Sequence, residues 1–142
     1  MSIYAVIDTN VLLSALLSKT ADAATVRVMD AVFDGRITPL LHPDILAEYR
    51  EVLHRERFHR DGDTVDAAVD ELAQLGITIS SVGTDETFAD PDDVVFYAVV
   101  MEKRKTEDAY LVTGNLRHFP KKPFVLTPAE MLELLEKADA DQ

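Results

Sequence analysis

Short apolar runs alternate with amphipathic helical segments from one end of this 142-residue chain to the other. Residues 3–7 form a continuous apolar run that stops at Asp8-Thr9-Asn10, a pattern typical of a parallel strand buried on both faces. Helical patterns follow over residues 11–17 and 23–33. Because strands alternate with helices and neither a linker nor a repeat interrupts them, the sequence predicts an α/β fold with a mostly parallel sheet.

The remaining elements repeat this alternation. Apolar runs predict further strands over residues 37–41, 77–82, 110–113 and 124–126. Helices are expected over residues 43–53, 64–75, 91–102 and from 128 onward, with Asp90 as one N-cap, a turn over residues 60–63, and a capping box from Thr127 to Glu130. Pro39 suits an edge strand or a bulge, because proline cannot donate to a ladder. We expect one domain over residues 1–138 and a frayed acidic tail over 139–142.

The charge and the amino-acid composition of the chain exclude several types of functional site. The chain carries 14 basic against 26 acidic residues, a net charge of −12, which argues against long-range attraction to nucleic acid or an anionic membrane. A polyanionic partner therefore needs a local basic patch or a bound metal. The absence of cysteine excludes disulfides, thiolate zinc sites and cysteine nucleophiles, and the four histidines show no zinc-binding spacing. No apolar run is long enough for a membrane span, and the N-terminus has no basic region or cleavage site like that of a signal peptide, so we expect a soluble cytoplasmic protein.

Acidic and polar residues fall where predicted strands end. They are Asp8 after the first strand, Glu48 in the helix after the second, Asp90, Asp92 and Asp93 after the third, and Thr113 to Asn115 after the fourth. In open parallel sheets the ligand site lies outside the carboxyl ends of the strands. Carboxylates gathered there repel one another unless a cation lies among them, which favours Mg²⁺ or Mn²⁺.

Each segment also has a plainer interpretation. Glu48 shares a helical face with the apolar stripe of Ile45, Tyr49 and Val52, but an acid at the edge of such a stripe is often solvated. Asp8-Thr9-Asn10 and the acids at 90–93 are typical helix caps, and Thr113-Gly114-Asn115 is an ordinary turn. The functional interpretation gains weight because segments far apart in sequence map to one end of one sheet.

These residues resemble the PIN-domain family of metal-dependent ribonucleases. The family's opening strand appears as VIDTN with Asp8, its glutamate-bearing helix as ILAEYREVL with Glu48, its third acid as Asp93 five residues before Ala98, and its closing pattern as LVTGN with Asn115. The match covers nearly the whole chain. Within the family, the chain is most similar to toxin components of toxin-antitoxin pairs.

The resemblance implies a three-layer α/β/α sandwich and hydrolysis of phosphodiester bonds in single-stranded RNA. By analogy Asp8, Glu48 and Asp93 would hold one or two Mg²⁺ or Mn²⁺ ions, and Asn115 would complete this set of catalytic and metal-binding residues. The supporting residues around them would be Thr9, Asn10, Thr113 and Asp90. Many relatives have aspartate at the position of Asn115, so a second metal would bind more weakly here and a one-metal enzyme becomes plausible.

Basic residues are unevenly distributed. Ten of the 14 lie in two stretches, one over residues 50–60 and one over 103–122. Arg117 and His118 follow Asn115 directly, so we expect them to contact the RNA backbone. For the lysines at 103, 105, 121 and 122 we favour a solvated surface role.

Other functions fit less well. A PIN-like scaffold with little activity, held by an antitoxin or by its own copy, is favoured by Asn115 and by the negative charge. Dimers are common in the family, and the apolar helix faces at 11–17 and 67–75 offer a surface for one. A phospho-receiver needs a lysine that LVTGN lacks, and a haloacid-dehalogenase-type phosphatase needs a second aspartate that DTNVL lacks. The sequence does not identify the RNA.

Overall fold

A computed structural model describes residues 2–55, 62–80 and 91–140. Five parallel strands form one sheet in the order β3-β2-β1-β4-β5. The strands are β1 (Ile3–Ile7), β2 (Ile37–Leu41), β3 (Ile77–Thr78), β4 (Ala109–Val112) and β5 (Val125–Leu126). The predicted α/β class with a parallel sheet is therefore confirmed.

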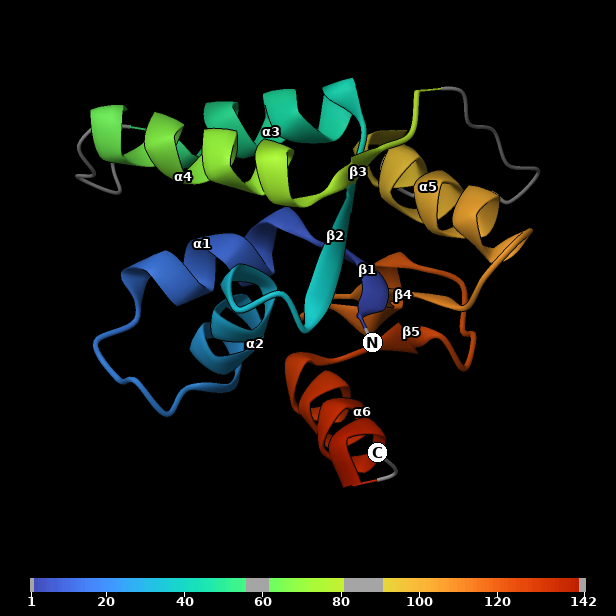
Figure 1. Cartoon of the computed structure of the whole chain (residues 1–142). Coiled ribbons are helices and arrows are strands. Elements are labelled where there is room, and N and C mark those ends of the chain that lie inside the picture. The colour runs from blue at the N-terminus through green and yellow to red at the C-terminus, as the bar shows by residue number, and fades with distance from the viewer. Residues whose placement is uncertain (1, 56–61, 81–90, 141–142) are drawn as a thin grey trace.

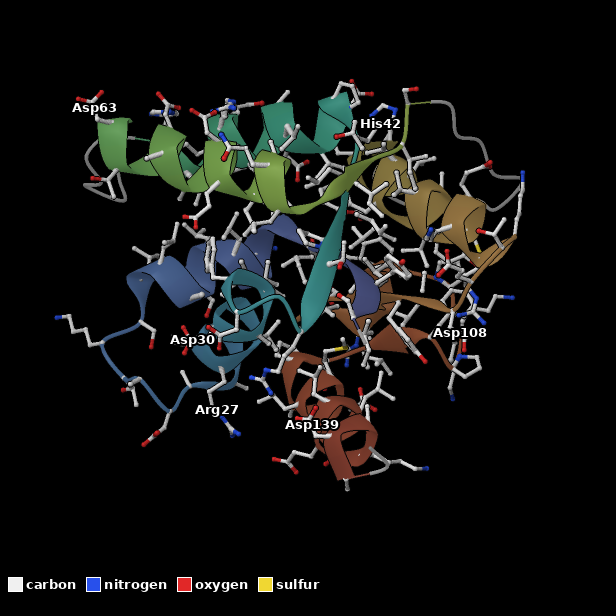
Figure 2. All side chains as sticks on the ribbon, viewed as in Figure 1. Arg27, Asp30, His42, Asp63, Asp108 and Asp139 are labelled. Atoms are coloured by element: carbon white, nitrogen blue, oxygen red, sulfur yellow. The ribbon has the colours of Figure 1, made fainter. Side chains whose placement is uncertain are left out.

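Helices cover both faces of this sheet, which gives the three layers that the resemblance implied (Figure 1). They are α1 (Thr9–Leu17), α2 (Ala24–Phe33), α3 (Pro43–Leu53), α4 (Gly62–Leu75), α5 (Val94–Arg104) and α6 (Pro128–Ala140). In Figure 1, α3, α4 and α5 lie above the sheet, whereas α2 and α6 lie below it and α1 packs on α2. Figure 2 marks the lower pair by Arg27 on α2 and Asp139 on α6. Because both faces are covered, β1 and β4 are apolar, and Ala5, Val6 and Leu111 are completely buried.

Local sequence signals set several element boundaries. The α2 helix ends at Asp34 and Gly35, and Gly35 has a φ of 86°, a conformation that favours glycine. At the start of α6, the Thr127 amide donates to the Glu130 carboxylate at 2.9 Å and the Glu130 amide donates to the Thr127 hydroxyl at 3.2 Å. The predicted capping box is thus confirmed.

Other expectations need correction. The strand containing Pro39 is internal, but β3 pairs only with Leu40 and Leu41, so Pro39 borders no β3 residue and breaks no ladder on that side. The strand predicted over residues 77–82 is only the two residues of β3, and residues 81 and 82 lie outside the described ranges. The predicted turn at residues 60–63 falls partly outside them too, while its last two residues already belong to α4.

The chain ends differ slightly from the prediction as well. The last helix includes residues 139 and 140, which we expected to be frayed, and Asp139 lies 3.5 Å from Arg36. Asp90, the expected N-cap, lies outside the described ranges, and Asp93 occupies the N-cap position of α5 without a capping hydrogen bond from its side chain. Within the described residues, no helix is both long and apolar enough to cross a bilayer.

The strand order creates a topological switch point. From central β1 the chain moves outward through β2 to β3, and it then returns to the other side of β1 for β4 and β5. Crevices for ligands form outside the carboxyl ends of the strands at such a point. Asp8 directly follows β1 and Thr113 directly follows β4, so the fold brings both residues to this crevice.

Candidate active site

Asp8 is a buried acid at the end of β1. Its relative exposure is 6%, and its carboxylate accepts a 2.8 Å hydrogen bond from the Thr113 hydroxyl. Although Asp8 occupies the N-cap position of α1, its side chain makes no capping hydrogen bond, so helix capping does not explain it. Burial raises the pKa of Asp8, and this effect outweighs the opposing influence of Thr113, the Thr9 amide and His118. The surroundings of Asp8 therefore do not stabilise the ionised form of its side chain.

Thr113 connects Asp8 to the loop after β4. It is completely buried, and its hydroxyl accepts a hydrogen bond from the Asn115 amide at 3.0 Å while donating to Asp8. One hydroxyl thus joins residues that are 105 positions apart in the sequence. Apart from tyrosines, the buried polar side chains of the described residues are Asp8, Thr9 and Thr113, and all three belong to this crevice.

Glu48 comes from α3, the helix that follows β2. The Thr9 hydroxyl donates to the Glu48 carboxylate, so Glu48 points toward the end of β1 rather than into open solvent. The next residue, Tyr49, is buried, and its hydroxyl donates to the Ile7 carbonyl at 2.6 Å. Burial raises the pKa of Tyr49 far above its ordinary value, and the negative charges of Asp8 and Glu48 raise it further. The Tyr49 hydroxyl is therefore a permanent donor beside two acids.

His118 lies between Asp93 and Asn115. Its Nδ1 atom is 3.6 Å from the Asp93 carboxylate, and its Nε2 atom is 2.9 Å from the Asn115 side-chain nitrogen. Asp93 is mostly shielded, with 15% of its side chain exposed, whereas His118 is half exposed. Through this histidine, the start of α5 meets the turn that follows β4.

A cavity of about 500 Å³ adjoins Glu48 between α3 and α5. Its charged lining is almost entirely acidic, and comprises Asp44, Glu48, Glu51 and Asp92, with His42 beside them. Figure 2 shows His42 where α3 begins, and its ring accepts a hydrogen bond from the Asp44 amide at 3.0 Å. A phosphate backbone would be repelled from this side of the crevice.

Three predicted residues are not part of this arrangement. Asn10 is exposed on α1 and makes no hydrogen bond to the carboxylates within the described ranges. Arg117 is exposed and lines a separate hollow, and Asp90 lies outside the described residues. The crevice therefore contains Asp8, Thr9, Glu48, Thr113 and the group around His118.

The oxygen atoms of these side chains are suitable ligands for a hard cation, but the side chains do not converge on one metal site. Carboxylate oxygens of Asp8, Glu48 and Asp93 and the amide oxygen of Asn115 are the donors that Mg²⁺ and Mn²⁺ prefer. Among the described residues, however, no group of three or more acids and histidines is close enough to hold a metal ion. Each acid has its own partner instead: Thr113 for Asp8, Thr9 for Glu48 and His118 for Asp93. The donor set fits a divalent ion whose binding would replace some of these contacts.

A buried acid and two partly buried ones at the switch point of a parallel α/β sheet define a class of proteins that bind a ligand at the carboxyl ends of the central strands. The PIN domain family model matches residues 4–117, which is most of the chain. The chain therefore belongs to the PIN domain family, whose members are generally nucleases. No curated protein matches this chain.

Sequence reasoning missed the role of Tyr49 and part of the role of His118. Tyr49 was interpreted only as part of an apolar stripe. A buried tyrosine hydroxyl usually has a hydrogen-bond partner, and the position of Tyr49 directly after Glu48 could have indicated that this partner lies near the site. His118 was assigned to RNA contact, but in the folded chain it touches Asp93 and Asn115. No sequence spacing indicates that contact, because it depends on how α5 packs beside β4.

Proposed function

We propose that this chain is an endoribonuclease that hydrolyses phosphodiester bonds of single-stranded RNA with Mg²⁺ or Mn²⁺. The observation that carries the proposal is the buried Asp8 carboxylate at the switch point. Burial raises its pKa, so the fold gains nothing from its charge, and a cation is the partner that would favour the ionised form. Destabilising acids of this kind are typical of functional positions.

The residues have separate roles in this proposal. Asp8, Glu48, Asp93 and Asn115 would hold one or two ions, and a divalent ion supplies an activated water and neutralises charge on the leaving oxygen. Thr113 keeps the Asp8 carboxylate in place, and Thr9 does the same for Glu48.

The direct test is cleavage of a mixed-sequence single-stranded RNA by the purified chain with Mn²⁺. We expect cutting that stops with EDTA and falls by about 10²-fold or more in Asp8→Asn and Asp93→Asn, since each change removes one charge from the proposed metal ligands. Asp108→Asn is the matched control, because Asp108 is exposed before β4 at the opposite end of the sheet (Figure 2). Circular dichroism of each variant shows that the fold survives. An Asp8→Asn chain that still cuts at the original rate contradicts the proposal.

A PIN-like scaffold with little activity is the second candidate. Asn115 favours it, because an amide offers an oxygen but no charge to a second metal. Calorimetry with Mn²⁺ distinguishes the two candidates: an unmutated chain that binds no Mn²⁺ and cuts no RNA supports the scaffold. In the nuclease, Asn115→Asp should tighten Mn²⁺ binding, whereas in a scaffold that binds no metal it need not.

The toxin role is a finer proposal that depends on the resemblance alone. It assigns the protein to the cytoplasm, where its RNA would be found, together with a small antitoxin encoded by a neighbouring gene and, as the resemblance implied, a dimer. Co-expression with the product of that gene should suppress cleavage. A neighbouring product that neither binds the chain nor inhibits it argues against the toxin role while leaving the nuclease untouched.

A further inference from the structure

A second hollow, which shares no lining residue with the acidic cavity, lies along the loop between β4 and β5. Its volume is about 340 Å³, within the lower range of ligand pockets. Its walls are mainly apolar and its rim is basic; the lining residues are Leu116, Arg117, Phe119, Pro120, Lys121, Lys122 and Val125. Leu116 is 44% exposed, the highest value among the exposed large apolar residues of the described chain. An apolar hollow with a cationic rim suits a flat apolar ring attached to an anion.

Two of the cations at this rim, Arg117 and Lys121, have no acidic partner among the described residues. They make no ion pair within the described part of the chain, whereas half of its lysines and arginines do. Arg50, for example, binds Asp66 and Asp70, and Lys103 binds Glu107. In a chain with a net charge of −12, two adjacent cations without acidic partners form a local anion-binding surface.

The hollow shares one short turn with the candidate active site. Residues Leu116–His118 form a single 3₁₀ turn capped by Asn115. His118 faces Asp93, whereas Leu116 and Arg117 line the hollow. A chain bound along this turn would therefore pass directly from the hollow to the carboxylates.

From this arrangement we propose that the hollow between Leu116 and Val125 is a nucleotide subsite, which takes a base of single-stranded RNA next to the cleaved bond while Arg117 and Lys121 bind its phosphates. The inference deepens the proposed function and rests on it. It also assigns Lys121 to RNA, where the sequence favoured a solvated lysine. Single-stranded RNA is recognised by apolar contact with unstacked bases and by cations along the backbone, which are the two features of this surface.

Phosphate contacts are tested by equilibrium binding of a fluorescent mixed-sequence single-stranded RNA in EDTA, where no cleavage occurs. We expect the Arg117→Ala/Lys121→Ala chain to bind at least about tenfold more weakly, and the slope of log K against log salt to fall by about 1.4, or 0.7 for each lost phosphate contact. The matched control is Lys19→Ala/Lys137→Ala, which removes the same charge from exposed lysines outside the hollow. Equal weakening in both double variants would mean a nonspecific charge effect and overturn the proposal.

Base binding is tested with Leu116→Ala and an abasic oligonucleotide of the same length. This variant should weaken RNA binding about fivefold, which corresponds to about 1 kcal/mol for one base contact, and should leave abasic binding unchanged. Equal losses on the two ligands overturn the base subsite. Binding of polyglutamate that exceeds binding of RNA also overturns it, and indicates an acidic protein partner instead.

Cleavage assays separate this inference from the function on which it rests. If the unmutated chain cuts RNA with Mn²⁺ and Asp93, but the Arg117→Ala/Lys121→Ala chain binds and cuts like the lysine control, the subsite is wrong and the nuclease stands. If RNA binding needs Arg117, Lys121 and Leu116 in a chain that never cuts, binding of RNA in the hollow is supported, but the nuclease and the place of the hollow beside a cleaved bond are refuted. An unmutated chain that binds no RNA overturns the subsite outright.

Discussion

Replacing Tyr49 with phenylalanine removes a single oxygen from a completely enclosed position. The Tyr49 hydroxyl donates to the Ile7 carbonyl at 2.6 Å, and the pairing of β1 with β2 extends only to Ala5 and Pro39. Without the Tyr49 hydroxyl, the buried Ile7 carbonyl beside Asp8 loses the hydrogen-bond donor that it has beyond the end of the β1–β2 ladder. Leaving a buried acceptor unsatisfied costs about 1–3 kcal/mol.

This cost converts into a measurable change in melting temperature. At about 4 °C for each kcal/mol, Tyr49→Phe should melt about 4–12 °C below the unmutated chain, and urea denaturation should show the same loss of unfolding free energy. Tyr110→Phe is the matched control, because the Tyr110 side chain is only half buried and makes no hydrogen bond within the described residues. We expect the control to change stability by no more than about 0.5 kcal/mol. A Tyr49→Phe chain as stable as the control would refute the reasoning.

The pH dependence of this difference is a second check. Burial and the charges of Asp8 and Glu48 raise the pKa of Tyr49 above its ordinary value of 10.0, so the folded chain keeps the hydroxyl protonated when the unfolded chain begins to lose its proton. The stabilisation by Tyr49 is therefore fully present below pH 10 and declines as the pH rises further. The gap between the two chains should be constant at neutral pH and should narrow above pH 10. A gap that already narrows near pH 7 would contradict the assignment.

Further predictions concern the charges and the last helix. Because burial raises the pKa of Asp8 above 3.8, its charge destabilises the fold increasingly as the pH rises from that value, and Asp8→Asn should melt at a higher temperature at pH 7 in EDTA; a lower melting temperature would contradict this. The hydrogen bond from His54 lowers the pKa of Asp66, so NMR titration should place this carboxyl below 3.8 and His54→Ala should move it upward; an unchanged titration would exclude His54 as the main cause. Thr127→Ala should lower the unfolding free energy by about 1 kcal/mol and Glu130→Gln should not, since glutamine preserves the capping box. Equal losses in these two variants would mean that the box is not the source.

Local patterns were sufficient where neighbouring residues decide the structure. The run over residues 3–7 became β1, and the proline after His42 became the first residue of α3. Capping chemistry at Thr127 and Glu130 involves residues three positions apart, so the sequence shows both partners together. Pro39 was expected in an edge strand or at a bulge, but it lies in an internal strand, where its tolerance depends on where the pairing with β3 begins. The residues around the proline do not show that.

The residues of the candidate site could be named from the sequence, but their relations could not. Asp8, Glu48 and Asp93 followed from the ends of predicted strands and from the family resemblance. The sequence did not indicate the neutral or basic neighbour that each of these acids has in the structure. Tyr49 shows the same limit, because its apolar helix face concealed a hydroxyl that reaches the end of β1.

The sequence by itself determined the alternation of strands and helices, the membership of the fold class and the identity of the acids, because these depend on side-chain type and on spacing along the chain. Only the tertiary structure decided which partners those acids meet. The Thr113 hydroxyl reaches Asp8 across 105 positions and the Thr9 hydroxyl reaches Glu48 across 39. These contacts arise because the strand order places β4 beside β1 and because α3 packs against the end of β1. Hydrogen bonds act over a few ångströms, and only the packed sheet brings such distant residues within that range.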